Sequence, residues 1–171
     1  MVTEQEKTMA ALRTAIQMEI DGKEFYLKTS QSSRNPLGIR LFQTLAKEED
    51  NHRQKFEDIF RLIQEQKSWP EVKFQPQAGE FKNIFSLASQ NIEPAQTEME
   101  AVQKAMEMEN KTRDYYQEMA KKAVFPAERD YLTALAEEER MHHITLLDYY
   151  EYLKDPSGWF TIKERHSLDG G

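Results

Sequence analysis

The sequence predicts an all-α protein, a four-helix bundle with a long crossover between the second and third helices. Long stretches of the 171-residue chain are free of helix breakers, because only six Gly and six Pro occur and most of them cluster. Charged residues make up 31% and apolar residues 39%, a balance that suits long amphipathic helices. Two of the three links between helical stretches are short and must join antiparallel neighbours, whereas the middle link is long enough to run along the bundle.

The first helical hairpin is expected over residues 3–66. Its first helix covers residues 3–30, and apolar side chains recur there at helical spacing, namely Leu12, Ile16, Ile20 and Leu27. Its second helix opens at Pro36, because asparagine followed by proline is a typical cap and first-turn pair, and it continues to about Gln66.

The second hairpin is expected over residues 94–154, with helices at 94–122 and 126–154. The crossover at 67–93 contains several breakers and leaves room for one short helix at 79–89. Residues 1–154 then form one bundle domain. The remaining residues, 155–171, begin with Asp-Pro-Ser-Gly and are expected to be a non-helical tail whose role the sequence leaves open.

The chain repeats itself at an offset of 90 residues without a gap, which indicates two duplicated hairpins and a pseudo-twofold core. The identical pairs are Ala15/Ala105, Met18/Met108, Glu19/Glu109, Tyr26/Tyr116, Pro36/Pro126, Leu45/Leu135, Ala46/Ala136, Glu48/Glu138, Glu49/Glu139, His52/His142 and Asp58/Asp148.

The repeated polar residues predict a metal site. Each half contains a Glu-x-x-His motif, and residues three apart lie on one helix face, so both side chains of a motif can reach the same ions. One further Glu, Glu19 or Glu109, repeats on the other helix of each hairpin. This Glu and the motif of the same hairpin are equally far from the turn that joins the two helices, so all candidates fall in one layer of the bundle. The candidate ligands are Glu19, Glu49, His52, Glu109, Glu139 and His142.

The ligand set favours two divalent ions, with iron as the first choice and manganese as the alternative. Four carboxylates balance two divalent cations, whereas four buried acids without cations are costly. Oxygen-rich ligation with two imidazoles suits iron or manganese. The absence of cysteine excludes disulfides, thiol catalysis and an iron centre with four thiolate ligands in this chain. Tyr26 and Tyr116 lie two turns beyond Glu19 and Glu109 and could donate hydrogen bonds to the ligating carboxylates.

The other repeated or unusual polar residues are interpreted as structural or solvated. Glu48, Glu138, Asp58 and Asp148 point off the ligand face, and His143 and His166 are expected at the surface. The formal charge of −7 argues against binding to nucleic acid or to an anionic membrane surface. No apolar run reaches membrane-spanning length, and the first residues do not look like a signal peptide, so a cytoplasmic protein is expected.

These motifs resemble the rubrerythrin branch of the ferritin-like superfamily over about residues 15–153. The likeness lies in AIQMEIDGKEFY and LAKEEDNH in one half, and in AMEMENKTRDYY and LAEEERMH in the other. The resemblance implies a ferritin-like di-iron bundle in which Glu19 and Glu109 are terminal ligands and Glu49 and Glu139 bridge the two irons. It also implies one histidine per iron, His52 and His142, and a homodimer.

The resemblance further implies an oxidoreductase that reduces hydrogen peroxide, or a relative that activates dioxygen or oxidises ferrous iron. Two departures qualify the peroxidase assignment. The chain lacks the cysteines of a rubredoxin domain, so electrons must come from a separate, rubredoxin-type donor. The extra Glu of rubrerythrins, three residues from the ligand on the third helix, has no counterpart, because Met106 and Thr112 flank Glu109 at that spacing. A ferroxidase and a metal-free structural bundle are the alternatives.

Overall fold

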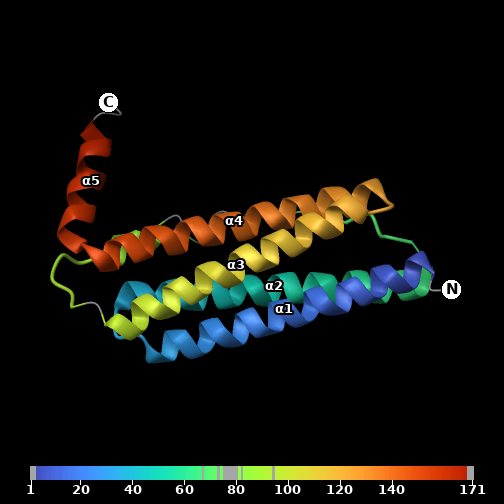
Figure 1. Cartoon of the computed structure of the whole chain (residues 1–171), viewed down its shortest axis with the longest axis horizontal. Coiled ribbons are helices and arrows are strands. Elements are labelled where there is room, and N and C mark those ends of the chain that lie inside the picture. The colour runs from blue at the N-terminus through green and yellow to red at the C-terminus, as the bar shows by residue number, and fades with distance from the viewer. Residues whose placement is uncertain are drawn as a thin grey trace.

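The computed structural model describes residues 3–66, 68–72, 74, 81, 83–93 and 95–168. Four long helices lie side by side along one axis (Figure 1): α1 (Glu4–Ser32), α2 (Pro36–Gln66), α3 (Gln96–Lys122) and α4 (Pro126–Lys154). α1 pairs with α2 and α3 pairs with α4 as antiparallel hairpins. The predicted all-α four-helix bundle is confirmed, and each helix begins and ends within two residues of its expected bounds.

Local sequence signals explain where the helices begin. Thr3 and Glu6 form a capping box at the start of α1, each side chain accepting from the other's backbone N–H. At the start of α2, the Asn35 side-chain oxygen accepts from the Leu37 backbone N–H at 3.0 Å. Pro126 occupies the first turn of α4, where its missing N–H costs nothing.

The crossover runs from the end of α2 to the opposite end of the bundle, where α3 begins (Figure 1). Trp69 anchors its start by packing on Tyr131 of α4, with ring centroids 6.2 Å apart. Near its end, a single 3₁₀ turn η1 (Ile84–Leu87) replaces the short helix expected at 79–89, and residues 79, 80 and 82 lie outside the described part. The Ser89 backbone is held by the Tyr152 hydroxyl at both its N–H and its carbonyl.

The expectation of a non-helical tail is wrong, because α5 (Pro156–Leu168) follows α4 directly and turns away from the bundle axis (Figure 1). Proline and glycine here begin a helix rather than prevent one. The Asp155 side chain caps α5 by accepting from the Gly158 N–H at 3.0 Å, and Pro156 takes the first helical position. Residues 169–171 of the expected tail lie outside the described part.

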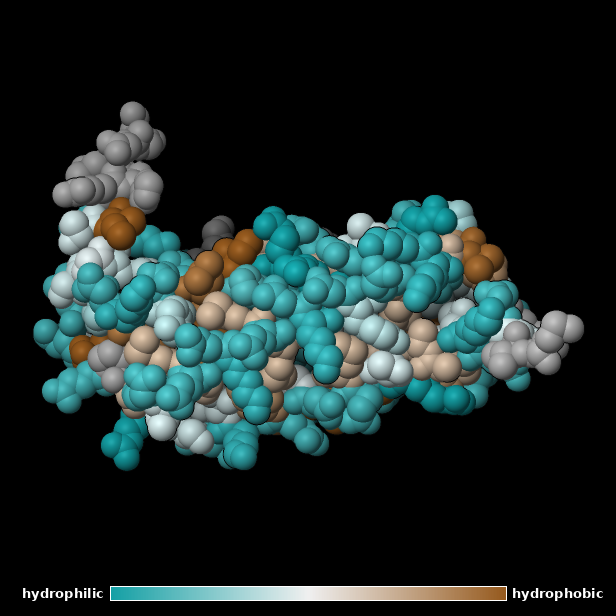
Figure 2. All heavy atoms as spheres, viewed as in Figure 1, coloured by the Kyte–Doolittle hydropathy of each residue, from teal (hydrophilic) through white to brown (hydrophobic). Residues whose placement is uncertain are grey.

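Two apolar clusters fill the bundle, one toward each end. One includes Leu12, Phe56 and Leu132, and the other includes Leu41, Leu45 and Leu146. The face of the molecule drawn in Figure 2 is mostly hydrophilic, with isolated apolar patches. Leu27, one of the apolar positions on the first helix, is 40% exposed rather than part of the core. None of the helices in the described ranges has the length and apolarity needed to span a membrane.

Candidate metal centre

The structure brings all six candidate ligands into one buried layer between the two apolar clusters. Each long helix contributes at least one of them, and none is more than 4% exposed. The burial pattern of residues 11–20 is identical to that of residues 101–110, as the duplication predicts. The members of the layer are Glu19 on α1, Glu49 and His52 on α2, Glu109 on α3, and Glu139 and His142 on α4.

The layer contains two overlapping groups of possible ligand atoms. In each group, one atom per residue lies within 4.8 Å of all the others. The first group is Glu19, Glu49, His52 and Glu139, and the second is Glu49, Glu109, Glu139 and His142. Both groups contain Glu49 and Glu139, so these two carboxylates would be shared if each group held an ion, while each remaining residue belongs to one group.

The polar atoms of this layer fit a pair of cations. His52 Nδ1 lies 3.2 Å from Glu139 Oε1 and 3.5 Å from Glu19 Oε2, and His142 Nδ1 faces three carboxylates at 3.4–3.5 Å. Buried polar atoms are normally paired, because an unpaired one loses its hydration without compensation. Here several have no hydrogen-bond partner among the described residues: Glu19 Oε2, Glu49 Oε1, both Glu139 oxygens and the two histidine Nδ1 atoms. Divalent cations would satisfy all of them.

In the absence of cations, most of the ionisable side chains of the layer have raised pKa values and so bind protons more tightly than usual. Burial raises the pKa of Glu19, of Glu49 and of Glu109, the last to about 8, and neighbouring carboxylates add to the shift of Glu49 and Glu109. Glu139 differs: burial and Glu49 raise its pKa, but the His142 and His52 rings beside its carboxylate outweigh them, and the net shift is downward. Burial lowers the pKa of both histidines, yet the surrounding carboxylates raise it well above the ordinary value.

Two tyrosine hydroxyls hold the outer carboxylates, as the sequence suggested, but they do so across the hairpins. Tyr26 of α1 donates to Glu109 of α3, and Tyr116 of α3 donates to Glu19 of α1. Both tyrosines are fully buried, and burial raises the pKa of each hydroxyl well above its usual value. The two hydroxyls therefore stay protonated and fix the rotamers of the two carboxylates.

Glu48 and Glu138 also belong to the site, which the sequence reasoning missed. Glu138 Oε2 lies 2.8 Å from His52 Nε2, and Glu48 Oε2 lies 2.8 Å from His142 Nε2. A carboxylate at Nε2 fixes the tautomer with its proton there, which leaves the Nδ1 lone pair facing the centre. Glu48 is 3% exposed, so of the two roles expected for it, structural or solvated, the solvated one is wrong.

A signal for this pair was present in the sequence. Glu48 and Glu138 repeat at the same 90-residue offset and directly precede the motif glutamates. Their side chains point about 100° away from the ligand face of their own helix. In this bundle that direction leads to the motif histidine of the neighbouring helix.

The surroundings of the layer differ between the duplicated halves. A Cβ atom on Gly22 would lie 2.8 Å from Glu49 Oε2, so the glycine makes room for this carboxylate. The equivalent position in the second half is Thr112, which is half-buried. Phe81 of the crossover packs on the His142 ring at 5.8 Å, and the His52 and His142 rings stack at 5.9 Å.

The remaining singled-out residues lie outside the layer. His143 is half-buried rather than a surface residue, and its Nδ1 lies 3.2 Å from the Met106 carbonyl oxygen. Asp58 pairs with Arg61 at the surface, and His166 falls on α5, away from the layer. Asp148 accepts from the Trp159 indole N–H and from Lys163, so it fastens α5 to α4.

Comparison with known proteins agrees with this geometry. No curated protein and no solved structure matches the chain. The family model described as Rubrerythrin matches residues 10–154, a stretch that includes all six residues of the buried layer, both tyrosines and the crossover. Since this match covers most of the sequence, the chain belongs to the rubrerythrin family.

Proposed function

We propose that this protein is a di-iron oxidoreductase that reduces hydrogen peroxide or dioxygen with electrons from a separate donor. The observation that carries the proposal is the sharing of Glu49 and Glu139 between two buried groups of possible ligands. Such sharing is the arrangement expected for two bridged metal ions. Membership of the rubrerythrin family supports iron as the metal and an oxidant as the substrate.

In this proposal Glu19 and Glu109 would each hold one ion, and Glu49 and Glu139 would hold both. His52 and His142 would each supply one nitrogen, Nδ1, which faces the carboxylates of the layer. Two ferrous ions held in this way would supply the two electrons that cleave an O–O bond. Oxygen ligands with two imidazoles also accept manganese, so metal identity has to be measured.

The protein's own part is to position the ligands and to exclude water. The layer is sealed by apolar clusters on both sides, which strengthens every electrostatic interaction inside it. Tyr26 and Tyr116 hold protons next to Glu109 and Glu19, where a reacting oxygen atom could receive them. Glu48 and Glu138 keep the histidines in the tautomer that binds a cation.

In this proposal the electrons come from a donor outside these 171 residues. The chain contains no cysteine, so it cannot hold the four-thiolate iron centre of a rubredoxin. We propose a rubredoxin-type donor on the strength of the family resemblance.

A ferroxidase that handles iron is the second candidate, and the third helix favours it. Positions 106 and 112, three residues on either side of Glu109, are Met and Thr, so the layer is a symmetrical set of six without an extra carboxylate. The presence of α5 also removes one argument against a cage, because cage ferritins carry a short fifth helix. The two candidates differ in stoichiometry and in size. A ferroxidase oxidises ferrous iron far beyond two ions per chain, and a cage is many times heavier than a dimer.

The test begins with protein purified anaerobically and without chelator. We expect two iron ions per chain, and rapid mixing of the ferrous protein with peroxide should oxidise both irons. Glu49→Ala should lose the bound metal and the reaction. Glu57→Ala is the matched control, because Glu57 is on the same helix, is 46% exposed and pairs with Arg53. A metal-free wild-type protein, or one that stays ferrous in peroxide, would contradict the proposal.

A further inference from the structure

A continuous line of aromatic rings leads from the candidate metal centre to α5. Its inner end is the tyrosine that donates to Glu109, and its outer end is a tryptophan at the start of α5. Successive ring centroids are 6.2, 6.0, 6.0 and 5.4 Å apart. The line is Tyr26, Phe42, Tyr149, Tyr152 and Trp159, and every member is at least nine-tenths buried.

A second line leaves the centre on the other side. It starts at the tyrosine that donates to Glu19, and its steps are 5.5, 6.0 and 6.2 Å. Its members are Tyr116, Phe56, Tyr131 and Trp69. The chain has two tryptophans in all, and each is the outer end of one line.

The two lines differ in their proton acceptors. Tyrosine loses its hydroxyl proton when it is oxidised, and tryptophan readily loses its indole proton, so oxidation is easiest where a base accepts that proton. In the first line the Tyr149 hydroxyl donates to Glu98 at 2.6 Å, and the Trp159 indole N–H donates to Asp148 at 2.8 Å. In the second line neither the Tyr131 hydroxyl nor the Trp69 indole N–H has a hydrogen-bond partner among the described residues.

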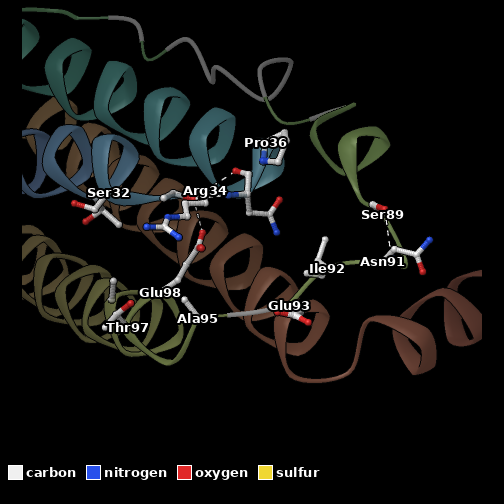
Figure 3. A pocket seen from close by; sticks show the side chains of 14 residues that line it. Ser32, Arg34, Pro36, Ser89, Asn91, Ile92, Glu93, Ala95, Thr97 and Glu98 are labelled. Atoms are coloured by element: carbon white, nitrogen blue, oxygen red, sulfur yellow. Dashed lines mark hydrogen bonds between the residues drawn. The ribbon is translucent and has the colours of Figure 1, made fainter.

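Glu98 and Asp148, which accept from Tyr149 and Trp159 in the first line, can exchange protons with water. Glu98 lines a cavity of about 770 Å³ that opens at the end of the bundle (Figure 3). The Asp148 side chain is 30% exposed. Lys163 stands 5.2 Å above the Trp159 ring, and its positive charge disfavours an indole radical cation. Trp159 must therefore give up its proton together with its electron.

We propose that Tyr26, Tyr149 and Trp159 carry an oxidising equivalent from the metal centre to α5, with the Phe42 and Tyr152 rings bridging the gaps between them. This proposal rests on the proposed reaction with peroxide. Reduction of one peroxide to two waters takes two electrons and two protons. When only one of the two irons is ferrous, that iron supplies one electron and the protein must supply the other.

The second electron leaves the Trp159 ring, and its Nε1 proton passes to the Asp148 carboxylate. The product is a neutral indole radical beside a protonated Asp148, and the two protons consumed with peroxide come from solvent. A one-electron reductant at α5 then restores the ring, and Asp148 returns the proton. While oxidised, Tyr26 and Tyr149 shift their hydroxyl protons along the hydrogen bonds to Glu109 and Glu98, and they take them back on reduction. Phe42 has no such proton, and the Tyr152 hydroxyl donates only to the Ser89 carbonyl, so the electron crosses these two rings without oxidising them, and the crossings are the slow steps of the line.

The first experiment mixes the one-electron-reduced, iron-loaded protein with peroxide and freezes it for electron paramagnetic resonance. We expect an indole radical that is identified by ring-deuterated tryptophan. Trp159→Phe should lose this signal, and Trp69→Phe, the matched control at the end of the other line, should retain it. If iron binds and peroxide is consumed without an indole radical, or if Trp69→Phe alone removes the signal, the relay is wrong and the proposed function stands.

The second experiment tests the relay without metal, so it decides the matter even if the proposed function fails. Because the chain has no cysteine, Ser157→Cys on the exposed face of α5 offers one attachment point for a ruthenium photo-oxidant. A flash should produce an indole radical and then a tyrosyl radical. Trp159→Phe should abolish the tyrosyl signal, and Asp148→Asn, which cannot take the proton, should slow its formation. Equal tyrosyl yields in Trp159→Phe and Trp69→Phe would overturn the proposal.

Discussion

At the scale of single residues, Gly22 provides space that the buried layer needs. Glu49 belongs to both groups of possible ligands, and one of its oxygens occupies the place where a side chain at position 22 would begin. The Glu49 oxygen is at the tip of a flexible side chain, so a methyl group at position 22 can be accommodated once Glu49 moves. That movement takes an oxygen away from its position between the two groups of possible ligands.

Gly22→Ala should therefore separate stability from metal binding. Alanine in the middle of a helix is favoured over glycine by about 0.5–1 kcal/mol, so the metal-free protein should unfold at the same temperature or slightly higher. Metal affinity should fall, because Glu49 can no longer occupy both groups. Thr112→Ala at the equivalent position is the control for titration against a competing chelator. Unchanged affinity in Gly22→Ala would show that Glu49 does not bridge.

The pairs between Glu48 or Glu138 and the histidines yield a second prediction. Loss of a partner that orients a metal-binding histidine typically lowers affinity by about 10–100-fold. Glu48→Ala should show this loss, whereas Glu48→Gln should retain part of the affinity, because its amide oxygen still accepts from His142 Nε2. Nitrogen-15 spectra of the histidine rings, recorded with a diamagnetic divalent metal bound, report which ring nitrogen carries the proton. Glu137→Gln, an exposed change on α4, should alter neither result.

The six layer residues could be predicted from the sequence because periodicity along one helix and a 90-residue repeat specify them. Glu48 and Glu138 could not be assigned in the same way. Their role depends on which helix lies beside their own, and no pattern within one helix contains that information. The crossing of the tyrosine contacts between hairpins has the same origin.

At the scale of elements, the four long helices were predictable and α5 was not. Long breaker-free stretches and strong caps mark the bundle helices. At α5, the same residues that stop α4 start a new helix, and composition alone does not distinguish the two outcomes. The difference lies in tertiary contacts, since Trp159 stacks on Phe85 of the crossover at 5.5 Å and Asp148 of α4 binds Lys163.

The N-cap at Asp155 should determine how stable the first turns of α5 are. Asp155→Ala removes the acceptor of the Gly158 N–H, and loss of such a cap costs about 0.5–2 kcal/mol. Hydrogen exchange should accelerate over the first turns of α5 while α4 and the metal content remain unchanged. Asp130→Ala, an exposed change inside α4, serves as the control. Faster exchange throughout α4 would mean that α5 is part of the bundle's cooperative unit.

At the scale of the whole molecule, the bundle is two apolar clusters joined through a layer of acids and histidines. Burial of the apolar side chains in each cluster is favourable at any pH. Burial of the carboxylates in the layer is favourable only when protons or cations neutralise them. Stability, metal loading and pH are therefore linked. In the metal-free protein the folded state keeps protons that the unfolded chain has released.

The sign of the pH dependence follows from these pKa shifts. The ordinary carboxyl pKa is 4.5 and that of Glu109 in the fold is about 8, so raising the pH across this interval should destabilise the metal-free protein. The raised pKa of His52 and of His142 acts in the same direction, because their favourable charge is lost as the pH rises. Glu139 acts oppositely, and only below its ordinary value of 4.5.

Cations reverse this dependence, because they bind the deprotonated layer and their affinity grows as protons leave. Free metal at 100 times the dissociation constant adds about 2.7 kcal/mol per site. Two sites then raise the melting temperature by roughly 10–20 °C for a chain of this size. Melting curves of loaded and chelated protein should therefore diverge as the pH rises from 4.5 to about 8. Glu49→Ala should abolish the divergence and Glu57→Ala should keep it. Parallel curves in the wild-type protein would show that the acids of this layer are not held together by metal.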